Sequence, residues 1–309
     1  MELLDIIEQV EKSYGITVNN VLSIDEGVSC SQILESTNGK YVMKTANDAF
    51  KDTMNDSLDI LLFLETKDFN VPRVIKNLSG DCVTEFDDNT IILYEYIEAN
   101  EIEPIFDYKK LGTLVGELHL HLSDYKQDLL IRDKYFFIDR YIEILTKKNY
   151  DINKIEKYKR LGDFLWTKLE KLEKGYCHGD LHTGNIILDK KFEYNIIDFD
   201  TSCMAYSIYD VMIVCNLTDY FEFNETALKE TYESYRTFLS EYTKLCKVSK
   251  EEEESLYYLI GIYHYQLQAT IVEIYGLDCI DHTFIDKQLE WLEEWMKATT
   301  SLTGLQFDL

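Results

Sequence analysis

The chain has 309 residues, of which 46% are hydrophobic, 57 are acidic and 31 are basic, so its formal net charge at pH 7 is −26. This excess of acids disfavours nucleic acid and anionic membrane surfaces as partners, because both require a basic face. The hydrophobic content is sufficient for one large domain or for two lobes.

The seven cysteines are scattered along the chain without any Cys-x-x-Cys spacing. This distribution argues against a disulfide framework or a zinc site. The N-terminal segment carries acids early and lacks a basic region, which is not the pattern of a signal peptide. No apolar run approaches the length of a membrane span. We therefore expect a cytoplasmic, reduced protein.

The first third of the chain is predicted to form a small sheet with one helix inside it. Asn38-Gly39 is a typical hairpin turn between two of the strands. The expected elements are a helix over residues 2–14, strands over 18–24, 31–35 and 41–45, a helix over 56–64, and strands over 74–77, 82–86 and 90–97.

The remainder is predicted to be mostly helical. Apolar residues follow helical spacing over 111–122 and 155–172, and longer helical stretches are expected near 225–246, 250–276 and 281–300. The sequence has only two prolines, so its helices can run long.

The chemistry is indicated by HGDLHTGN at residues 178–185 and IIDFD at 196–200. Asp180 stands five residues before Asn185, and Asp198 stands thirteen residues after it. In phosphoryl transfer, an Asp receives the proton of the attacking hydroxyl, while an Asn and a later Asp hold magnesium on the nucleotide phosphates. Asp180 is therefore the predicted catalytic base, and Asn185 and Asp198 are the predicted Mg²⁺ ligands.

The segment between the two metal ligands has the pattern of a β-hairpin. One apolar run covers residues 186–188 and another covers 194–197, with polar residues near the turn. A hairpin would bring Asn185 and Asp198 alongside each other, as two ligands of one metal site require.

HGDLHTGNIIL…NIIDFD resembles the aminoglycoside phosphotransferase and choline kinase group, the small-molecule relatives of protein kinases. Protein kinases usually carry His-Arg-Asp and Asp-Phe-Gly, whereas this chain has Gly179 and Asp200 at the differing positions. The resemblance implies an α+β, protein-kinase-like bilobal fold. Its small antiparallel-sheet N-lobe would span residues 1–97, and its mainly helical C-lobe, with the catalytic loop and acceptor pocket, would span 98–309.

Lys44 ends an apolar strand and matches the lysine that contacts the nucleotide phosphates in kinases. Lys40 is a rival, but it is expected in the turn and facing solvent. The loop before the second strand has one glycine, Gly27, where protein kinases have three. Gly27, Ser29 and Ser31 could cover the phosphates, although an ordinary hairpin turn is an equal alternative.

The segment that links the lobes is expected near residues 91–97. The nucleotide base should hydrogen-bond to the backbone of Glu95, Tyr96 and Ile97, and Tyr94 falls at the family's gatekeeper position. Tyr94 would narrow the pocket behind the base, or it could simply be an aromatic core residue.

The acid that pairs with Lys44 is left open by the sequence. The family has a glutamate where this chain has Ser57, and the nearby acids are Asp56, Asp59 and Glu65. His178 and His182 are expected to brace the catalytic loop, and Cys177 to be a small buried residue.

The leading hypothesis is an enzyme that transfers the γ-phosphoryl group of ATP or GTP, with Mg²⁺, to a hydroxyl of a small cationic molecule such as an aminoglycoside. Candidate acceptor-binding acids are Asp200, Glu273 and Asp278. Choline, ethanolamine, homoserine and other metabolites are alternative acceptors. A non-catalytic nucleotide-binding pseudokinase is a further alternative, and a metal-dependent phosphohydrolase would require additional ligands.

Overall fold

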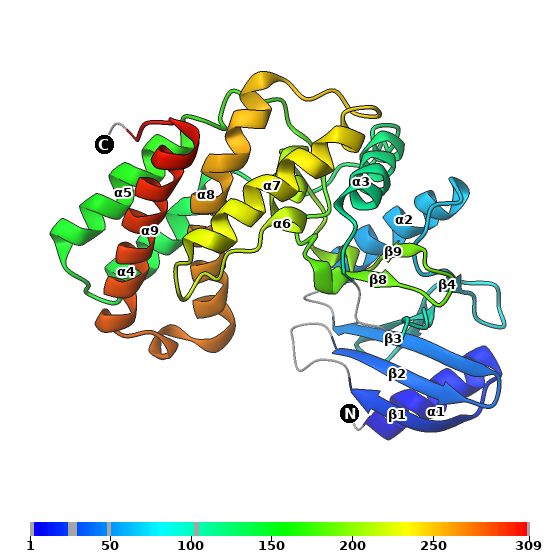
Figure 1. Cartoon of the computed structure of the whole chain (residues 1–309). Helices are drawn as coiled ribbons and strands as arrows, with labels where there is room; N and C mark the ends of the chain where they lie inside the picture. Colours follow the sequence, from blue (N-terminus) through cyan, green and yellow to red (C-terminus); the bar gives the residue numbers. More distant parts are fainter. Residues whose placement is uncertain (1–2, 24–29, 48–50, 102–104, 308–309) are drawn as a thin grey trace. The chain divides into compact units, whose positions relative to one another are not determined.

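The computed structural model describes residues 3–23, 30–47, 51–101 and 105–307 (Figure 1). These residues form two compact units. Unit 1 comprises Met1–Ile105, Asp124–Gln127 and His182–Ser202, and unit 2 comprises Phe106–Ser123, Asp128–Leu181 and Cys203–Leu309. The chain therefore passes from one unit to the other inside the HGDLHTGN motif. A lobe boundary at residue 97 stays a prediction.

Unit 1 contains the antiparallel sheet that the sequence predicts. The strands run in the order β1-β2-β3-β6-β4, and β5 pairs with β6 (Figure 1). Their bounds are β1 Val18–Ser23, β2 Cys30–Ser36, β3 Gly39–Asn47, β4 Val74–Ile75, β5 Thr84–Phe86 and β6 Asn89–Glu95. All six expected strands are confirmed, although β4 and β5 are shorter than predicted.

One face of this sheet is covered by α1 (Leu3–Tyr14), whose apolar side joins the sheet in a common core. The buried members of this core are Val10, Tyr14, Ile16, Leu34, Met43, Ile91 and Leu93. Helix α2 (Lys51–Thr66) starts five residues before its predicted beginning and buries its leucine-rich side.

The predicted hairpin is also confirmed. Strands β8 (Ile186–Leu188) and β9 (Tyr194–Ile196) are antiparallel, with Ile186 opposite Ile196. The amide of Ile196 donates to the carbonyl of Asn70 at 3.1 Å, which joins the hairpin to the turn after α2.

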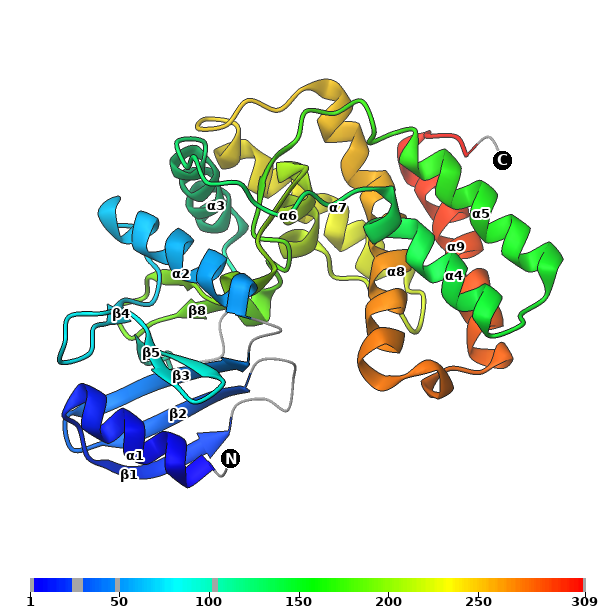
Figure 2. The same ribbon diagram turned by 180° about the vertical axis from the view of Figure 1, so that it is seen from behind.

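Unit 2 is mainly helical (Figure 2). Its helices are α3 Tyr108–Leu122, α4 Arg140–Lys147, α5 Ile152–Trp166, α6 Ser207–Cys215, α7 Glu225–Tyr242, α8 Lys250–Tyr275 and α9 His282–Thr303, with a π-helical turn, η1, at Tyr135–Asp139 before α4. Two short strands, β7 (Gly175–Cys177) and β10 (Cys203–Ala205), pair with each other. The sequence did not predict η1, α4, α6, β7 or β10.

The acidic run at residues 251–254 lies at the start of α8, where negative charge favours the helix dipole. Ser249 and Glu252 form a reciprocal capping box there. Within the described part of the chain, no helix is long and apolar enough to cross a membrane.

Helix α3 packs closely on α7 because two of its residues lack side chains. A Cβ atom at Gly112 would lie 2.3 Å from the carbonyl oxygen of Phe238. One turn later, a Cβ atom at Gly116 would lie 3.0 Å from Leu245 Cδ1, the end of a flexible side chain. The backbone contact at Gly112 leaves no room for adjustment, whereas Leu245 can rotate.

We therefore expect Gly112→Ala to destabilise the fold by about 2–3 kcal/mol, the usual cost of overpacking. Gly116→Ala is the matched control, because a helix-propensity gain of about 1 kcal/mol offsets its milder contact. Urea denaturation followed by circular dichroism measures both. Equal midpoints for the two variants would contradict the close α3–α7 approach.

Candidate active site

The catalytic loop is anchored inside unit 2 by Asp210 of α6, a carboxylate that is fully buried. Its Oδ2 accepts from the His178 amide at 2.6 Å, and its Oδ1 accepts from the Gly179 amide at 3.0 Å. Gly179 has a φ of +86°, a left-handed conformation that glycine adopts without a steric penalty. Asp210 therefore holds the two residues that precede the predicted base, Asp180.

The anchor extends to α3 and α7. Asp210 Oδ2 lies 3.1 Å from His119 Nε2, and His119 Nδ1 lies 2.7 Å from the Tyr242 hydroxyl. Asp210 is not among the functional residues predicted from the sequence. The sequence does contain a signal for it, since Asp210 is a lone acid within an apolar helix. A charged side chain is almost never buried in such a helix unless it has polar partners, so its position indicates that it binds other groups.

The surroundings of Asp180 in unit 2 are aromatic. Burial raises the pKa of the Tyr209 hydroxyl well above its ordinary value, and the nearby Tyr263 and Asp180 groups raise it further. The pKa of Tyr263 is also raised, first by burial and then by Asp180. The rings of Tyr209 and Tyr263 are 6.1 Å apart. Two phenols, both neutral at physiological pH, therefore lie near the Asp180 carboxylate.

In unit 1 the hairpin brings the two predicted metal ligands together. The amide of Ile197 donates a hydrogen bond to the carbonyl of Asn185 at 3.0 Å. Asp198 is the next residue in the chain, so it lies close to Asn185. His182 Nδ1 accepts from the Gly184 amide at 3.0 Å, which confirms that this histidine braces the loop. Asp198 has a φ of +64°, which is unusual for a residue other than glycine.

Lys44 is held by two carboxylates of the same segment. Its Nζ lies 2.7 Å from Asp198 Oδ1 and 2.8 Å from Asp200 Oδ2, and its side chain is only 11% exposed. Burial alone would lower the pKa of Lys44, but Asp200 and Asp198 outweigh this effect and raise the pKa above its usual value. Lys44 therefore stays charged, as a phosphate-binding lysine must.

These contacts identify the acids paired with Lys44, which the sequence left open. The helix acids Asp56, Asp59 and Glu65 were the candidates there. Glu65 Oε1 instead accepts from the Val74 amide at 2.6 Å. At the position where the family has its glutamate, Ser57 is buried. Asp200 and Asp198, not an acid of α2, supply the negative charge beside Lys44 in this structure.

The residues predicted to surround the nucleotide base lie on and after β6. Tyr94 is 4% exposed, and its hydroxyl has no hydrogen-bond partner among the residues that the structure describes. Glu95, Tyr96 and Ile97 line a cavity of about 340 Å³ together with the β8–β9 turn. Their contact with a nucleotide base stays a prediction.

The structure describes only one of the three residues predicted to cover the phosphates. Gly27 and Ser29 lie outside the described residues. Ser31 is described, and it pairs with Lys44 across β2 and β3. This register places Ser31 beside the predicted phosphate-binding lysine, but its role stays a prediction.

The three candidate acceptor-binding acids each have a cation of the chain as partner. Asp200 contacts Lys44, Glu273 pairs with Arg140, and Asp278 Oδ1 lies 3.5 Å from Lys148 Nζ. Their role in acceptor binding stays a prediction. The tryptophans of α9, Trp291 and Trp295, are buried and stack on each other, as packing residues do.

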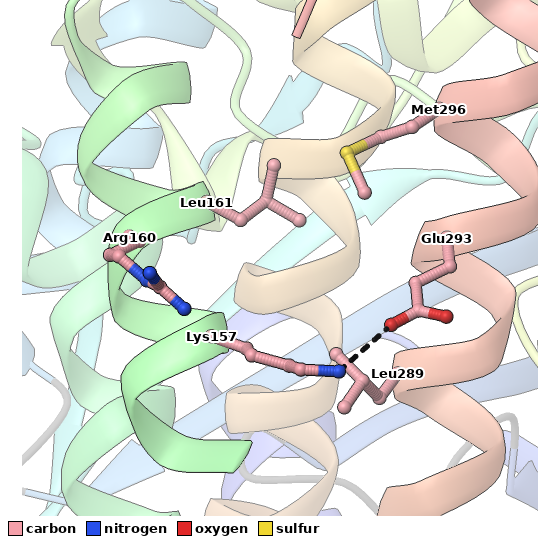
Figure 3. Close-up of a pocket in the computed structure, with 6 residues that line it drawn as sticks. All are labelled: Lys157, Arg160, Leu161, Leu289, Glu293 and Met296. Carbon is pink, nitrogen blue, oxygen red and sulfur yellow. Dashed lines mark hydrogen bonds and ion pairs between the residues drawn. The ribbon is translucent and has the colours of Figure 1, made fainter. Parts of the chain in front are cut away.

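A separate cavity of about 210 Å³ lies between α5 and α9 (Figure 3). Lys157 crosses it toward Glu293, with Nζ 3.5 Å from Oε1 (Figure 3). No residue of the HGDLHTGN motif lines it. This cavity therefore carries none of the chemistry that the motif predicts.

The donor set of the hairpin fits magnesium. Asn185 and Asp198 offer oxygen atoms, which Mg²⁺ prefers, and magnesium usually takes one or two protein ligands together with water and phosphate oxygens. Among the described residues, no group of three or more His, Cys, Asp or Glu side chains is arranged to hold a metal.

Residues 23–245 match the model of the phosphotransferase enzyme family. Because this match covers well over half of the 309 residues, the chain belongs to that family. It is therefore an enzyme of the small-molecule phosphotransferase type, as the motif resemblance implied.

Its similarity to individual proteins is more distant. A homoserine kinase of Methylobacillus flagellatus is 20% identical in an alignment of 219 residues that covers 68% of this chain and 67% of that protein. The solved amicoumacin kinase aligns over 100% of this chain and 96% of its own, with a TM-score of 0.75 and 15% identity. A microcompartment-associated aminopropanol kinase aligns over 97% and 98%, with a TM-score of 0.76 and 18% identity. These structures confirm the kinase-like fold.

We expect Asp210→Ala to destabilise the protein by about 3–5 kcal/mol, because it removes the partner of two buried amides and of His119. Asp210→Asn keeps one acceptor oxygen, so it should fold while losing turnover and retaining nucleotide binding. Thermal unfolding and kcat measure these effects. Asp163→Asn, at an exposed carboxylate paired with Lys134, is the control. Full turnover by a folded Asp210→Asn variant would rule out the anchoring role.

Proposed function

We propose that the protein transfers the γ-phosphoryl group of ATP or GTP to a hydroxyl group of a small molecule. The observation that carries the proposal is the ion pair of Lys44 with Asp198, two residues 154 positions apart in the chain. The kinase pattern assigns one to the phosphates and the other to the metal. Their contact, with Asn185 bonded beside Asp198, supports a common phosphate and metal site.

In the proposed reaction, Asp180 takes the proton of the acceptor hydroxyl. The acceptor oxygen forms a bond to the γ-phosphorus as the bond to the β–γ bridging oxygen breaks, and the nucleoside diphosphate leaves. Such transfer depends on positioning and on neutralising charge. Asp210 would fix the loop that presents Asp180, and the neutral phenols of Tyr209 and Tyr263 would keep water from its carboxylate.

Mg²⁺, when bound, would neutralise negative charge on the nucleotide phosphates. Asn185 and Asp198 would hold it, and Lys44 would bind the phosphates. Glu95, Tyr96 and Ile97 would hydrogen-bond the base, with Tyr94 behind it and with Gly27, Ser29 and Ser31 over the phosphates. The amicoumacin kinase structure contains AMP-PNP and a spectinomycin phosphotransferase structure contains ADP, which supports a nucleotide as co-substrate.

The acceptor is proposed to be a cationic small molecule. The net charge of −26 supports this choice, because an acidic protein concentrates cations. An aminoglycoside is one such acceptor, and choline, ethanolamine and homoserine are alternatives. The names of the relatives include an antibiotic kinase, an aminopropanol kinase and a homoserine kinase.

The free thiols of the described cysteines support a reducing, cytoplasmic location.

We expect Asp180→Asn to lower kcat by about 10²–10⁴-fold, the usual contribution of a general base. Nucleotide affinity should stay within about twofold, because the base acts on the acceptor. Coupled detection of nucleoside diphosphate, with aminoglycosides and amino alcohols as acceptors, measures the first effect, and calorimetry measures the second. Near-normal turnover by the variant would exclude Asp180 as the base. Nucleotide binding by the parent without turnover of any acceptor would instead favour the pseudokinase alternative.

Asp198→Ala should weaken binding of the magnesium–nucleotide complex as well as turnover, because it removes a charged metal ligand. The measurement is the rise in melting temperature caused by AMP-PNP with Mg²⁺, compared with AMP-PNP and EDTA. Asp68→Asn is the control, since this carboxylate is 97% exposed and pairs with Arg73. An unchanged magnesium-dependent rise in the Asp198→Ala variant would contradict the assignment.

A further inference from the structure

Two arginines of unit 2 converge on one aromatic ring. The guanidinium carbon of Arg132 lies 3.8 Å from the ring centre of Phe136, and that of Arg140 lies 4.3 Å from it. Arg140 Nε also donates to the Phe136 carbonyl at 2.8 Å. Phe136 belongs to η1, and π-helical turns are rare and often occur at functional sites.

The charges in this cluster are not balanced. Arg140 Nη1 binds Glu273, so two guanidinium cations share one paired carboxylate. Arg140 Nη2 and Arg132 Nε are buried and have no hydrogen-bond partner within the described residues. Burial lowers the pKa of Arg140, and the charge of Arg132 lowers it further against the opposing effect of Glu273. Each unpaired buried donor is costly, so the cluster gains from one more acceptor.

The cluster is connected to the predicted base. Tyr209 lies close enough to Arg140 to affect its pKa, and the pKa of Tyr209 itself responds to Asp180. The ring of Tyr209 also contacts Phe137, the neighbour of Phe136, with centroids 5.1 Å apart. Tyr209 is therefore a common neighbour of Arg140 and of the carboxylate that would act on the acceptor, and Arg132 is linked to this group through the ring of Phe136.

We propose that Arg132 and Arg140 recognise a carboxylate group of the acceptor, whose hydroxyl is presented to Asp180. This inference rests on the proposed function and names its substrate class, a small molecule that bears both a hydroxyl and a carboxylate. A planar guanidinium fork matches a carboxylate in geometry, and the stacked Phe136 ring holds the fork in place. Among the described residues Arg132 contacts the Cys203 thiol but forms no ion pair with a carboxylate. One carboxylate of the acceptor would balance its charge, whereas a phosphate would exceed it.

The test uses pairs of probes that differ only in the carboxylate. The pairs are L-homoserine and 3-aminopropan-1-ol, L-threonine and 1-aminopropan-2-ol, and L-serine and ethanolamine. With magnesium and ATP or GTP, the parent should have a lower KM for the acid in at least one pair. In Arg140→Gln and Arg132→Gln, that KM should rise by about 10–100-fold, the value of hydrogen bonds to a charged group. The KM for the amine and for the nucleotide should stay unchanged.

Two further variants separate recognition from packing. Glu273→Gln removes the partner of Arg140 but leaves both guanidinium groups. A contact of Glu273 with the ammonium group of the acceptor would serve the acid and the amine alike, so the ratio of the two KM values should still favour the acid. If Arg140 served only its ion pair, Glu273→Gln and Arg140→Gln would lose the preference together, and the inference would be wrong. Arg236→Gln is the matched control, because Arg236 bonds the carbonyl one turn earlier, as Arg140 does, but outside the cluster.

The outcomes also separate this inference from the proposed function. If the parent phosphorylates the amines and never favours an acid, the arginines do not bind the acceptor carboxylate and the phosphotransferase proposal stands. If a wider screen finds only acceptors without an anionic group, the inference is equally excluded. Failure to bind any magnesium–nucleotide complex would overturn the proposed function itself.

Discussion

The arrangement of unit 1 depends on one buried lysine. The side chain of Lys44 is only 11% exposed. A lysine so far removed from water stays charged only if carboxylates compensate for its lost hydration. Asp198 and Asp200 do so, and the pair joins β3 of the sheet to the segment after β9. Asp198 adopts a left-handed backbone conformation, which costs about 1–3 kcal/mol for such a residue. The ion pair and the hairpin bond to Asn185 together hold it there.

In unit 2, the first half of the HGDLHTGN motif is held by hydrogen bonds to a buried carboxylate. Asp210 binds two consecutive backbone amides and His119, so the loop before Asp180 is set by a carboxylate of the buried helix α6. The chain changes unit between Leu181 and His182. Each half of the HGDLHTGN motif is thus positioned by contacts within its own unit. The predicted base and the predicted metal ligands therefore have separate structural supports, and substitutions can affect one without the other.

The sequence predicted what depends on local pattern. Two short apolar runs were enough to place the β8–β9 hairpin. The apolar run before Lys44 indicated a strand there, which β3 confirms, while the role of Lys44 in phosphate binding stays a prediction. The sequence could not predict Asp210 or the partners of Lys44, because both depend on residues brought together from distant parts of the chain. Helix α6 is almost wholly buried, so it lacks the amphipathic period that reveals surface helices. The π-helical turn η1 was not predicted because its apolar residues follow neither the helical nor the strand period.

The overall charge and the local charge lead to different expectations for the acceptor. The net charge of −26 favours a cation, yet Asp200, Glu273 and Asp278 each have a cation of the chain beside them. The cluster at Phe136 is, in contrast, locally positive. A free anion approaching an acidic protein is repelled over roughly 10 Å at 0.1 M salt. A zwitterion has no net charge and escapes that repulsion, while its carboxylate can still bind Arg132 and Arg140 and its ammonium group can lie near carboxylates. A hydroxylated amino acid therefore satisfies both the charge of the whole chain and the unpaired arginine donors.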